Sequence, residues 1–151
     1  MKQKLYHYTE CGLDNVWLEN GFQIHKTPHG EGVSFNHAEQ LEQIIALGII
    51  SSASPLEPKE FRFLRNQLDM TQLEIAGLFG VDVQTIARWE KGENPINAAA
   101  DRLMRLLYWE QRDKTVPVKD TLWRLTEDRA QKKAKLVWRE ERGHWKPVKT
   151  A

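Results

Sequence analysis

The sequence predicts an α+β protein, in which a small antiparallel β-sheet and one helix precede a unit of short helices. Three observations carry this prediction. An Asn20-Gly21 dipeptide lies between two strand-like runs in residues 15–25, and it favours a two-residue hairpin because both residues tolerate positive φ. Residues 56–112 repeat helix N-cap signals and glycine stops at short intervals. A linker of serines, prolines and other small residues, residues 51–58, separates the two parts.

We expect three domains in the 151 residues: a small β-rich domain over residues 1–52, a helical domain over residues 53–112 and a basic extension over residues 113–151. Net charge follows a similar division, since it is −3 over residues 1–55, −1 over residues 56–112 and +5 over residues 113–151. The extension is either a tail that lies near phosphates or a solvated terminus. The whole chain carries only +1, so its bulk charge does not by itself predict a partner.

In the N-terminal domain we expect further strands at residues 4–8 and 33–35. Asn36, followed by Glu39 three residues later, predicts a helix N-cap with a capping box. That helix should end at Gly48.

In the extension, residues 120–129 predict a helix that turns Leu122 and Leu125 inward. Residues 135–147 predict a late hairpin around Arg142-Gly143.

Four short helices are expected in the helical domain. They cover residues 58–68, residues 72–79, residues 83–90 and a segment that begins near Asn97. Thr71 and Asp82 are the expected N-caps of the second and third helices, with Glu74 completing a capping box at Thr71. Glycines 80 and 92 follow these two helices, and glycine is the usual residue after a helix end.

Three residues of the second and third helices have a spacing that fits two crossing helices. Ala76 would lie where the helices cross, because a larger side chain there would force them apart. Gly80, four residues later, can take the positive φ of the turn. Ile86, six residues further on, would fill the core between the helices. This spacing is the fingerprint of a helix-turn-helix.

The sequence around that fingerprint resembles the Cro/CI/XRE family of transcriptional regulators. The matching residues are Leu64-Arg65, Met70-Thr71-Gln72, Ile75-Ala76, Phe79-Gly80-Val81 and the run Thr85-Ile86-Ala87-Arg88-Trp89-Glu90-Lys91-Gly92. The resemblance implies a lambda-repressor-like, five-helix and usually dimeric DNA-binding fold. It also implies that Glu90 pairs with Arg65. We expect Trp89 to be a core residue rather than a base-stacking one.

The resemblance implies a set of DNA-binding residues, and their chemistry agrees with it. Gln72 would touch phosphate, whereas Gln84 suits adenine, Arg88 suits guanine and Val83 can pack on a thymine methyl group. Thr85 would share the groove-facing side of the third helix, and Lys91 with the turn amides around Gly92 would meet backbone phosphates. The expected DNA-binding set is Gln72, Val83, Gln84, Thr85, Arg88 and Lys91.

The front of the chain is similar to the zinc ribbon of MqsA/YgiT-type antitoxins, in a degenerate form. Tyr8-Thr-Glu-Cys11-Gly12 matches a Cys-x-x-Cys-Gly knuckle whose first cysteine is replaced, and Lys26-Thr-Pro-His29-Gly30 matches a second knuckle that ends in histidine. Such antitoxins neutralise a toxin and repress their own operon. The family uses four cysteines, and this chain has one.

His7, Cys11, His25 and His29 are the only residues here that resemble a zinc ligand set. Strand alternation would turn His7 and Tyr8 to opposite sides, and Pro28 disfavours the helix that usually presents two histidines four residues apart. We therefore expect no metal and no cofactor. The segment would then act in partner binding or dimerisation.

The sequence thus predicts a sequence-specific repressor that binds duplex DNA at an inverted repeat as a homodimer, with a toxin as a further protein partner if it is an antitoxin. The alternative is a stand-alone or phage-type regulator without a toxin. A third, lower-ranked interpretation is a thiol- or metal-dependent enzyme that uses the His/Cys cluster, but we expect no enzyme. A single cysteine and the lack of a signal peptide or a long apolar run indicate a cytoplasmic protein with no membrane partner.

Overall fold

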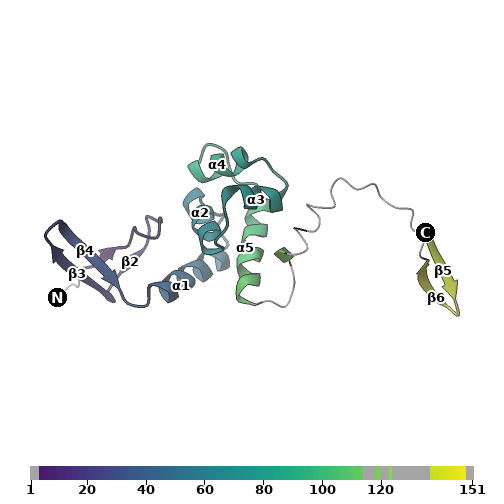
Figure 1. Cartoon of the computed structure of the whole chain (residues 1–151), viewed down its shortest axis with the longest axis horizontal. Helices are drawn as coiled ribbons and strands as arrows, with labels where there is room; N and C mark the ends of the chain where they lie inside the picture. The colour runs from purple at the N-terminus through teal and green to yellow at the C-terminus, as the bar shows by residue number, and fades with distance from the viewer. Residues whose placement is uncertain (1–3, 114–117, 120–122, 124–136, 149–151) are drawn as a thin grey trace.

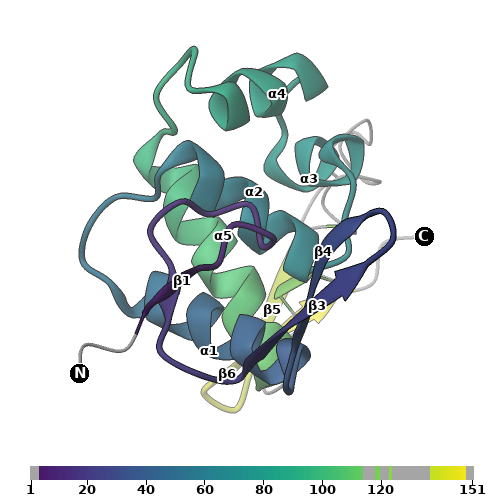
Figure 2. The same ribbon diagram turned by 90° about the vertical axis from the view of Figure 1, so that its left-hand side faces the viewer.

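The computed structural model describes residues 4–113, 118–119, 123 and 137–148 (Figure 1). In the described part, two antiparallel strand pairs and five helices are followed by a third strand pair. Figures 1 and 2 both place α4 at the far end of the helical unit from α1, and Figure 1 shows β2, β3 and β4 on the left, beyond α1. The α+β prediction therefore holds at the level of element content and order.

The N-terminal strands pair differently from the sequence prediction. β1 (Tyr6–His7) pairs with β2 (Trp17–Leu18), and β3 (Phe22–Thr27) pairs with β4 (Gly30–Phe35). The hairpin therefore turns at Pro28-His29, and the predicted hairpin at Asn20-Gly21 is wrong. A two-residue type I′ turn needs positive φ at both residues, but at this dipeptide only Gly21 has one, at 82°. The predicted strand at residues 33–35 is confirmed within β4.

An aromatic cluster explains why β3 pairs with β4. Phe22 and Phe35 are directly opposed in the ladder. The Tyr6 ring lies 5.0 Å from the Phe22 ring and 5.6 Å from the Phe35 ring, and the Tyr8 ring meets Phe35 edge-on at 4.7 Å. Tyr8 is buried and the other three aromatic residues are half-buried. Contacts among these rings favour the β3–β4 pairing over the local turn preference, since aromatic pairs add to the area that they bury.

Helix α1 spans Ala38–Ser51, and both of its predicted ends are wrong. The N-cap is His37 in the left-handed conformation with no side-chain cap, so the Asn36–Glu39 capping box does not form. The helix also continues through Gly48, because the next turn buries Ile49 at 8% exposure. Burial of an isoleucine is worth more than the roughly 1 kcal/mol that a glycine costs inside a helix.

The helices of the middle domain agree closely with the predicted ones. They are α2 (Pro58–Gln67), α3 (Gln72–Phe79), α4 (Val83–Lys91) and α5 (Ala98–Arg112). The caps at Thr71, Asp82 and Asn97 all form, with side-chain oxygens that accept from backbone N–H groups at 3.1, 2.8 and 2.7 Å. A further capping box joins Glu57 and Glu60 at the start of α2.

One hydrophobic core connects these helices to the N-terminal part of the chain. Its largest fully buried side chains are Phe61, Leu64, Ile75, Ile86, Met104 and Tyr108. Leu13, before β2, and Ala46 and Ile49, in α1, belong to the same core. The proposed boundary near residue 52 stays a prediction, but the core extends across it.

The linker after α1 is held by a buried charge pair on α5. Asp101 accepts a hydrogen bond from the backbone N–H of Leu56 at 2.6 Å and pairs with Arg105 at 2.6 Å. Arg105 in turn donates to the carbonyls of Ser52 and Ser54. These bonds fix the residues that lead from α1 into α2.

The late hairpin is confirmed: β5 (Val137–Glu141) pairs with β6 (His144–Val148). Arg142 and Gly143 both have positive φ, 50° and 80°, as a type I′ turn requires. The predicted helix over residues 120–129 lies outside the described residues apart from Trp123. That side chain lies against the helical core, with a ring atom 3.6 Å from the position that a Cβ on Gly77 would take.

Candidate nucleic-acid interface

Helices α3 and α4 are joined by a tight turn that needs glycine. Gly80 caps α3 with φ 68° and ψ 32°, a conformation that costs other residues energy. The N–H of Val81 then closes the turn on the carbonyl of Ala76 at 3.0 Å. Ala76 and Ile86 are buried at 2% and 0% exposure, as the spacing predicted. The backbone therefore forms the expected helix-turn-helix.

A buried polar network joins three helices beneath this motif. Arg65 on α2 donates from Nε and Nη2 to the Glu90 carboxylate at 2.8–3.2 Å, and its Nη1 donates to the carbonyl of Met70 at 2.9 Å. The two charged side chains are only 11% and 3% exposed. The predicted pairing of these residues is confirmed. Because the guanidinium fork meets the carboxylate at more than one atom, the pair fixes orientation as well as distance.

The same carboxylate also fixes Gln72, the first residue of α3. Gln72 donates from Nε2 to Glu90 Oε2 at 2.9 Å. A side-chain amide nitrogen carries two hydrogens, so one remains for a group outside the protein. The backbone amides at the start of α3 have the positive end of the helix dipole. This end of α3 therefore offers hydrogen-bond donors that suit a phosphate oxygen. The bond between Gln72 and Glu90 was not predicted from the sequence.

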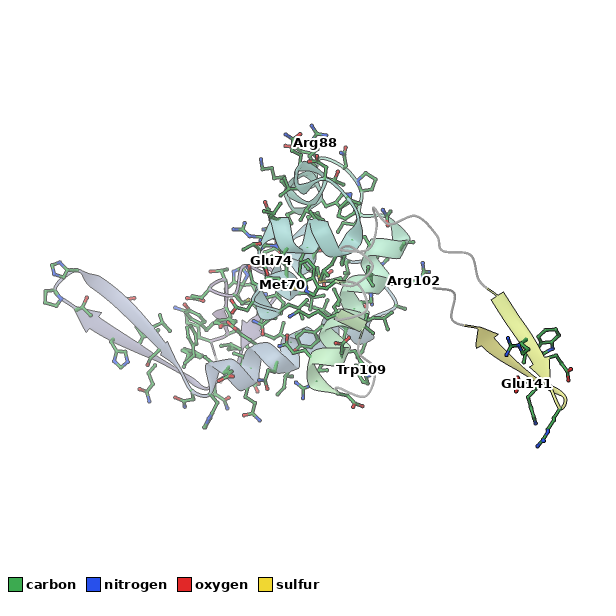
Figure 3. All side chains as sticks on the ribbon, turned by 45° about the vertical axis from the view of Figure 1, so that its right-hand side comes forward. Met70, Glu74, Arg88, Arg102, Trp109 and Glu141 are labelled. Carbon is green, nitrogen blue, oxygen red and sulfur yellow. The ribbon has the colours of Figure 1, made fainter. Side chains whose placement is uncertain are left out.

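Helix α4 has one buried side and one exposed side. Ile86 and Trp89 are buried at 0% and 4% exposure. Gln84, Arg88 and Lys91 are exposed on the opposite side, one turn apart, and Figure 3 shows Arg88 at the tip of the helical unit. The two other predicted groove residues lie at its margins: Thr85 is half-buried, and Val83 is 37% exposed.

Trp89 packs in the core, as predicted. Its ring meets the ring of Phe61 edge-on, with centroids 5.8 Å apart. The indole therefore anchors α4 to α2 and does not form part of the exposed side.

The start of α3 also holds a carboxylate in its charged form. Glu74 accepts from the backbone N–H of Thr71 at 3.1 Å and from its hydroxyl at 3.0 Å. The hydrogen bond from the Thr71 backbone N–H is the largest cause that lowers the pKa of Glu74 below its usual value.

An exposed leucine next to this cap was not singled out by the sequence pattern. Leu73 follows Gln72 on α3 and is 70% exposed. Leu73 is as apolar as the buried Ile75 and Leu78, so residue type alone does not predict its exposure. The exposure of Leu73 is seen only in the folded structure.

The structure does not bring the four zinc-ligand candidates together. His7 stacks on Trp17 with ring centroids 3.9 Å apart, while its Nε2 lies 2.7 Å from the carbonyl oxygen of Asp14. His25 is bonded to Ser34 across β3 and β4, and His29 lies in their turn. Within the described residues, no group of three His, Cys, Asp or Glu side chains is placed to hold a metal ion.

Cys11 has the environment of a packed thiol. It donates to the carbonyl oxygen of Tyr8 at 3.6 Å, and it packs against the hydrophobic core. Burial is the largest cause that raises its pKa. A thiol with a raised pKa is a weaker nucleophile at neutral pH, because the thiolate is the reactive form.

Comparison with known families agrees with this geometry over the helical domain. Residues 61–107, from the first buried residue of α2 to a buried leucine of α5, match the family model described as Helix-turn-helix. The match supports a helix-turn-helix of the Cro/CI/XRE type in this segment and, with it, a DNA-binding transcriptional regulator. Neither the curated proteins nor the solved structures contain a significant match to the chain. None of the helices in the described part is long and apolar enough to cross a membrane.

Proposed function

We propose that this chain is a sequence-specific repressor that binds an inverted-repeat operator in duplex DNA as a homodimer. The observation that carries the proposal is the exposed side of α4, where Gln84, Arg88 and Lys91 stand opposite the buried Ile86 and Trp89. An α-helix with such a polar side fits the major groove.

The residues of α4 and α3 would divide into two roles. Arg88 can make two parallel bonds to the major-groove edge of guanine, and Gln84 can do so with adenine. Val83 and Thr85 would make apolar contacts from the margins of that side. Gln72 and Lys91 would bind phosphates, and these contacts position the helix without reading the sequence.

Selection of bound DNA from a random pool tests this proposal. We expect enrichment of an inverted repeat whose half-site centres lie about one helical turn apart, roughly 34–36 Å. Enrichment of a motif without dyad symmetry would contradict the dimer. Absence of any enriched motif would contradict sequence-specific binding.

We further propose that the N-terminal strands bind a protein partner and that this partner is a toxin, which makes the chain an antitoxin. Leu5, Trp17 and Ile24 are each more than half exposed in this acidic part of the chain. The β3–β4 hairpin also offers exposed strand edges, which favour pairing with another chain. The alternative remains a stand-alone or phage-type regulator without a toxin.

Co-expression with the product of an adjacent small gene tests the antitoxin role. We expect rescue of growth and a stable complex, both lost in Trp17→Ser with Ile24→Ser. The control is Ile44→Ser, which removes a similarly exposed apolar side chain from α1. Rescue that persists in the strand variant would place the toxin elsewhere, and an adjacent product without toxicity would favour the stand-alone regulator.

We infer that the chain needs no metal or other cofactor and has no catalytic role. The separation of His7, Cys11, His25 and His29 supports this inference. Protein purified without chelator should contain well under one zinc per chain by elemental analysis, and a chelator should leave its melting temperature unchanged. Stoichiometric zinc with chelator-induced unfolding would restore the zinc-ribbon interpretation, because a structural zinc supplies folding energy.

A further inference from the structure

The outer side of α5 presents an apolar surface that no described residue covers. Leu106 and Trp109 are 55% and 54% exposed, although they stand one turn apart on a helix whose inner side is fully packed. Figure 3 labels Arg102 and Trp109 along this helix, away from the tip that carries Arg88. We name the α5 face by its residues: Arg102, Leu106, Trp109 and Glu110.

Opposite charges flank the apolar centre of the α5 face at equal distances. Arg102 lies four residues before Leu106, and Glu110 lies four residues after it. Arg102 is exposed and has no ion-pair or hydrogen-bond partner among the described residues. Glu110 accepts the backbone N–H of Lys119 at 3.0 and 3.3 Å, and a carboxylate has further lone pairs that can accept from an arginine.

This order of charges makes the face complementary to itself in one orientation. If two copies of α5 pack antiparallel with Leu106 at the two-fold axis, Arg102 of each copy meets Glu110 of the other. Parallel packing would instead oppose arginine to arginine and glutamate to glutamate. We propose that the α5 face is the interface between two copies of this chain, an isologous contact.

The interface deepens the dimeric DNA-binding function proposed above and rests on it. It leaves the exposed side of α4 free, since the α5 face is on a different side of the helical unit (Figure 3). A helix of 15 residues is only about 22 Å long. One such face buries less than the roughly 800 Å² per partner of a standard interface. The dimer should therefore depend on concentration and be stabilised by an operator that binds both copies.

Sedimentation equilibrium of the full chain without DNA tests the interface. Arg102→Glu alone and Glu110→Arg alone should each weaken dimerisation about tenfold, because symmetry makes each substitution act at two ion pairs. The double variant should return the dissociation constant to about the wild-type value, within threefold, since both pairs are restored with exchanged signs. Leu106→Lys should abolish the dimer, whereas Ile44→Lys, at 59% exposure on α1, should leave it intact.

The outcomes separate this inference from the proposed DNA binding. Unchanged dimerisation in Leu106→Lys, a double variant as weak as the single ones, or a wild-type chain that is monomeric at every concentration would each overturn the α5 interface. Binding of each variant to a single half-site is measured in parallel, with circular dichroism to confirm folding. Variants that lose the dimer but keep half-site affinity support the inference. A wild-type dimer that binds no half-site would refute the proposed function and leave the interface standing.

Discussion

Glu90 on α4 connects this helix to α2 and α3, because its carboxylate accepts hydrogen bonds from both Arg65 and Gln72. Arg65→Ala would leave this carboxylate, only 3% exposed, without its counter-charge. We expect a loss of about 3–5 kcal/mol in the free energy of unfolding, the usual cost of breaking a buried ion pair from one side. Urea denaturation measures it. Arg62→Ala, an exposed arginine on the same helix, is the control and should change stability by less than about 0.5 kcal/mol. Equal stability of the two variants would contradict the network.

Arg88 and Lys91 lie on the same side of α4 but should differ in what they contribute. Arg88→Ala should cost about 1–3 kcal/mol at the cognate site and relax the preference at one base pair per half-site, because arginine reads a base edge. Lys91→Ala should weaken cognate and scrambled DNA alike and reduce the salt dependence, because lysine at the helix end meets phosphate. Affinities for both DNAs at two salt concentrations distinguish the two. If Lys91→Ala removed specificity and Arg88→Ala did not, the groove residues would be wrongly assigned.

At the scale of the element, the capping box of α3 links stability to pH. Hydrogen bonds from Thr71 lower the pKa of Glu74. A carboxyl whose pKa is lower in the folded state stabilises the fold above its unfolded pKa, and this stabilisation is lost as pH falls through the folded pKa. We expect Glu74→Gln to melt below the wild type at neutral pH, with a difference that disappears in acid. Thermal melts over pH 3–7, roughly the range below and above a carboxyl pKa, measure it. Glu93→Gln is the control, and a difference that grew in acid would contradict the cap.

The helices of the middle domain could be predicted closely because their ends are set by neighbouring residues. Thr71 with Glu74, Asp82 and Gly80 act within one turn of the chain, and so they are visible in the sequence. Strand pairing is not local. The Asn20-Gly21 signal failed because the chain instead opposes Phe22 to Phe35, a contact that no short window of sequence reveals.

The exposed side of α4 could be predicted as closely as the helix ends, because it also follows from a local sequence pattern. Contacts between distant residues of the site could not. The 3.6-residue period identified the exposed and buried sides of α4, which the burial of Ile86 and Trp89 confirms. The bond from Gln72 to Glu90 and the clamp that Asp101 and Arg105 form on the linker both depend on side chains that meet only after folding. An Asp followed by Arg four residues later is the usual pattern of an exposed ion pair on a helix. The burial of the Asp101–Arg105 pair could therefore not be predicted from the sequence.

At the scale of the whole molecule, the N-terminal part is tied to the helical unit by apolar and polar contacts. Leu13, at 4% exposure, belongs to the core of the helices. Glu42 on α1 lies 3.3 Å from the Tyr8 hydroxyl, which donates to it, and accepts from Gln67 on α2 at 2.9 Å. Burial, then the charge of Glu42, raises the pKa of Tyr8 to about 12. The phenol therefore keeps its proton at neutral pH and remains a hydrogen-bond donor.

These contacts predict that the first 50 residues and the helical unit unfold together. Leu13→Ala removes a buried side chain before β2, and such truncations cost about 2–5 kcal/mol. We expect hydrogen exchange to accelerate at the amides of α2 and α5 as well as in the N-terminal strands, because they share one core. Leu5→Ala, at 52% exposure, is the control and should leave the exchange of both parts unchanged.

If Leu13→Ala accelerated exchange only in the N-terminal strands, the two parts would be energetically independent. A chain lacking residues 1–50 would then retain the stability of its helices, whereas a shared core requires that loss of Ala46 and Ile49 destabilise them.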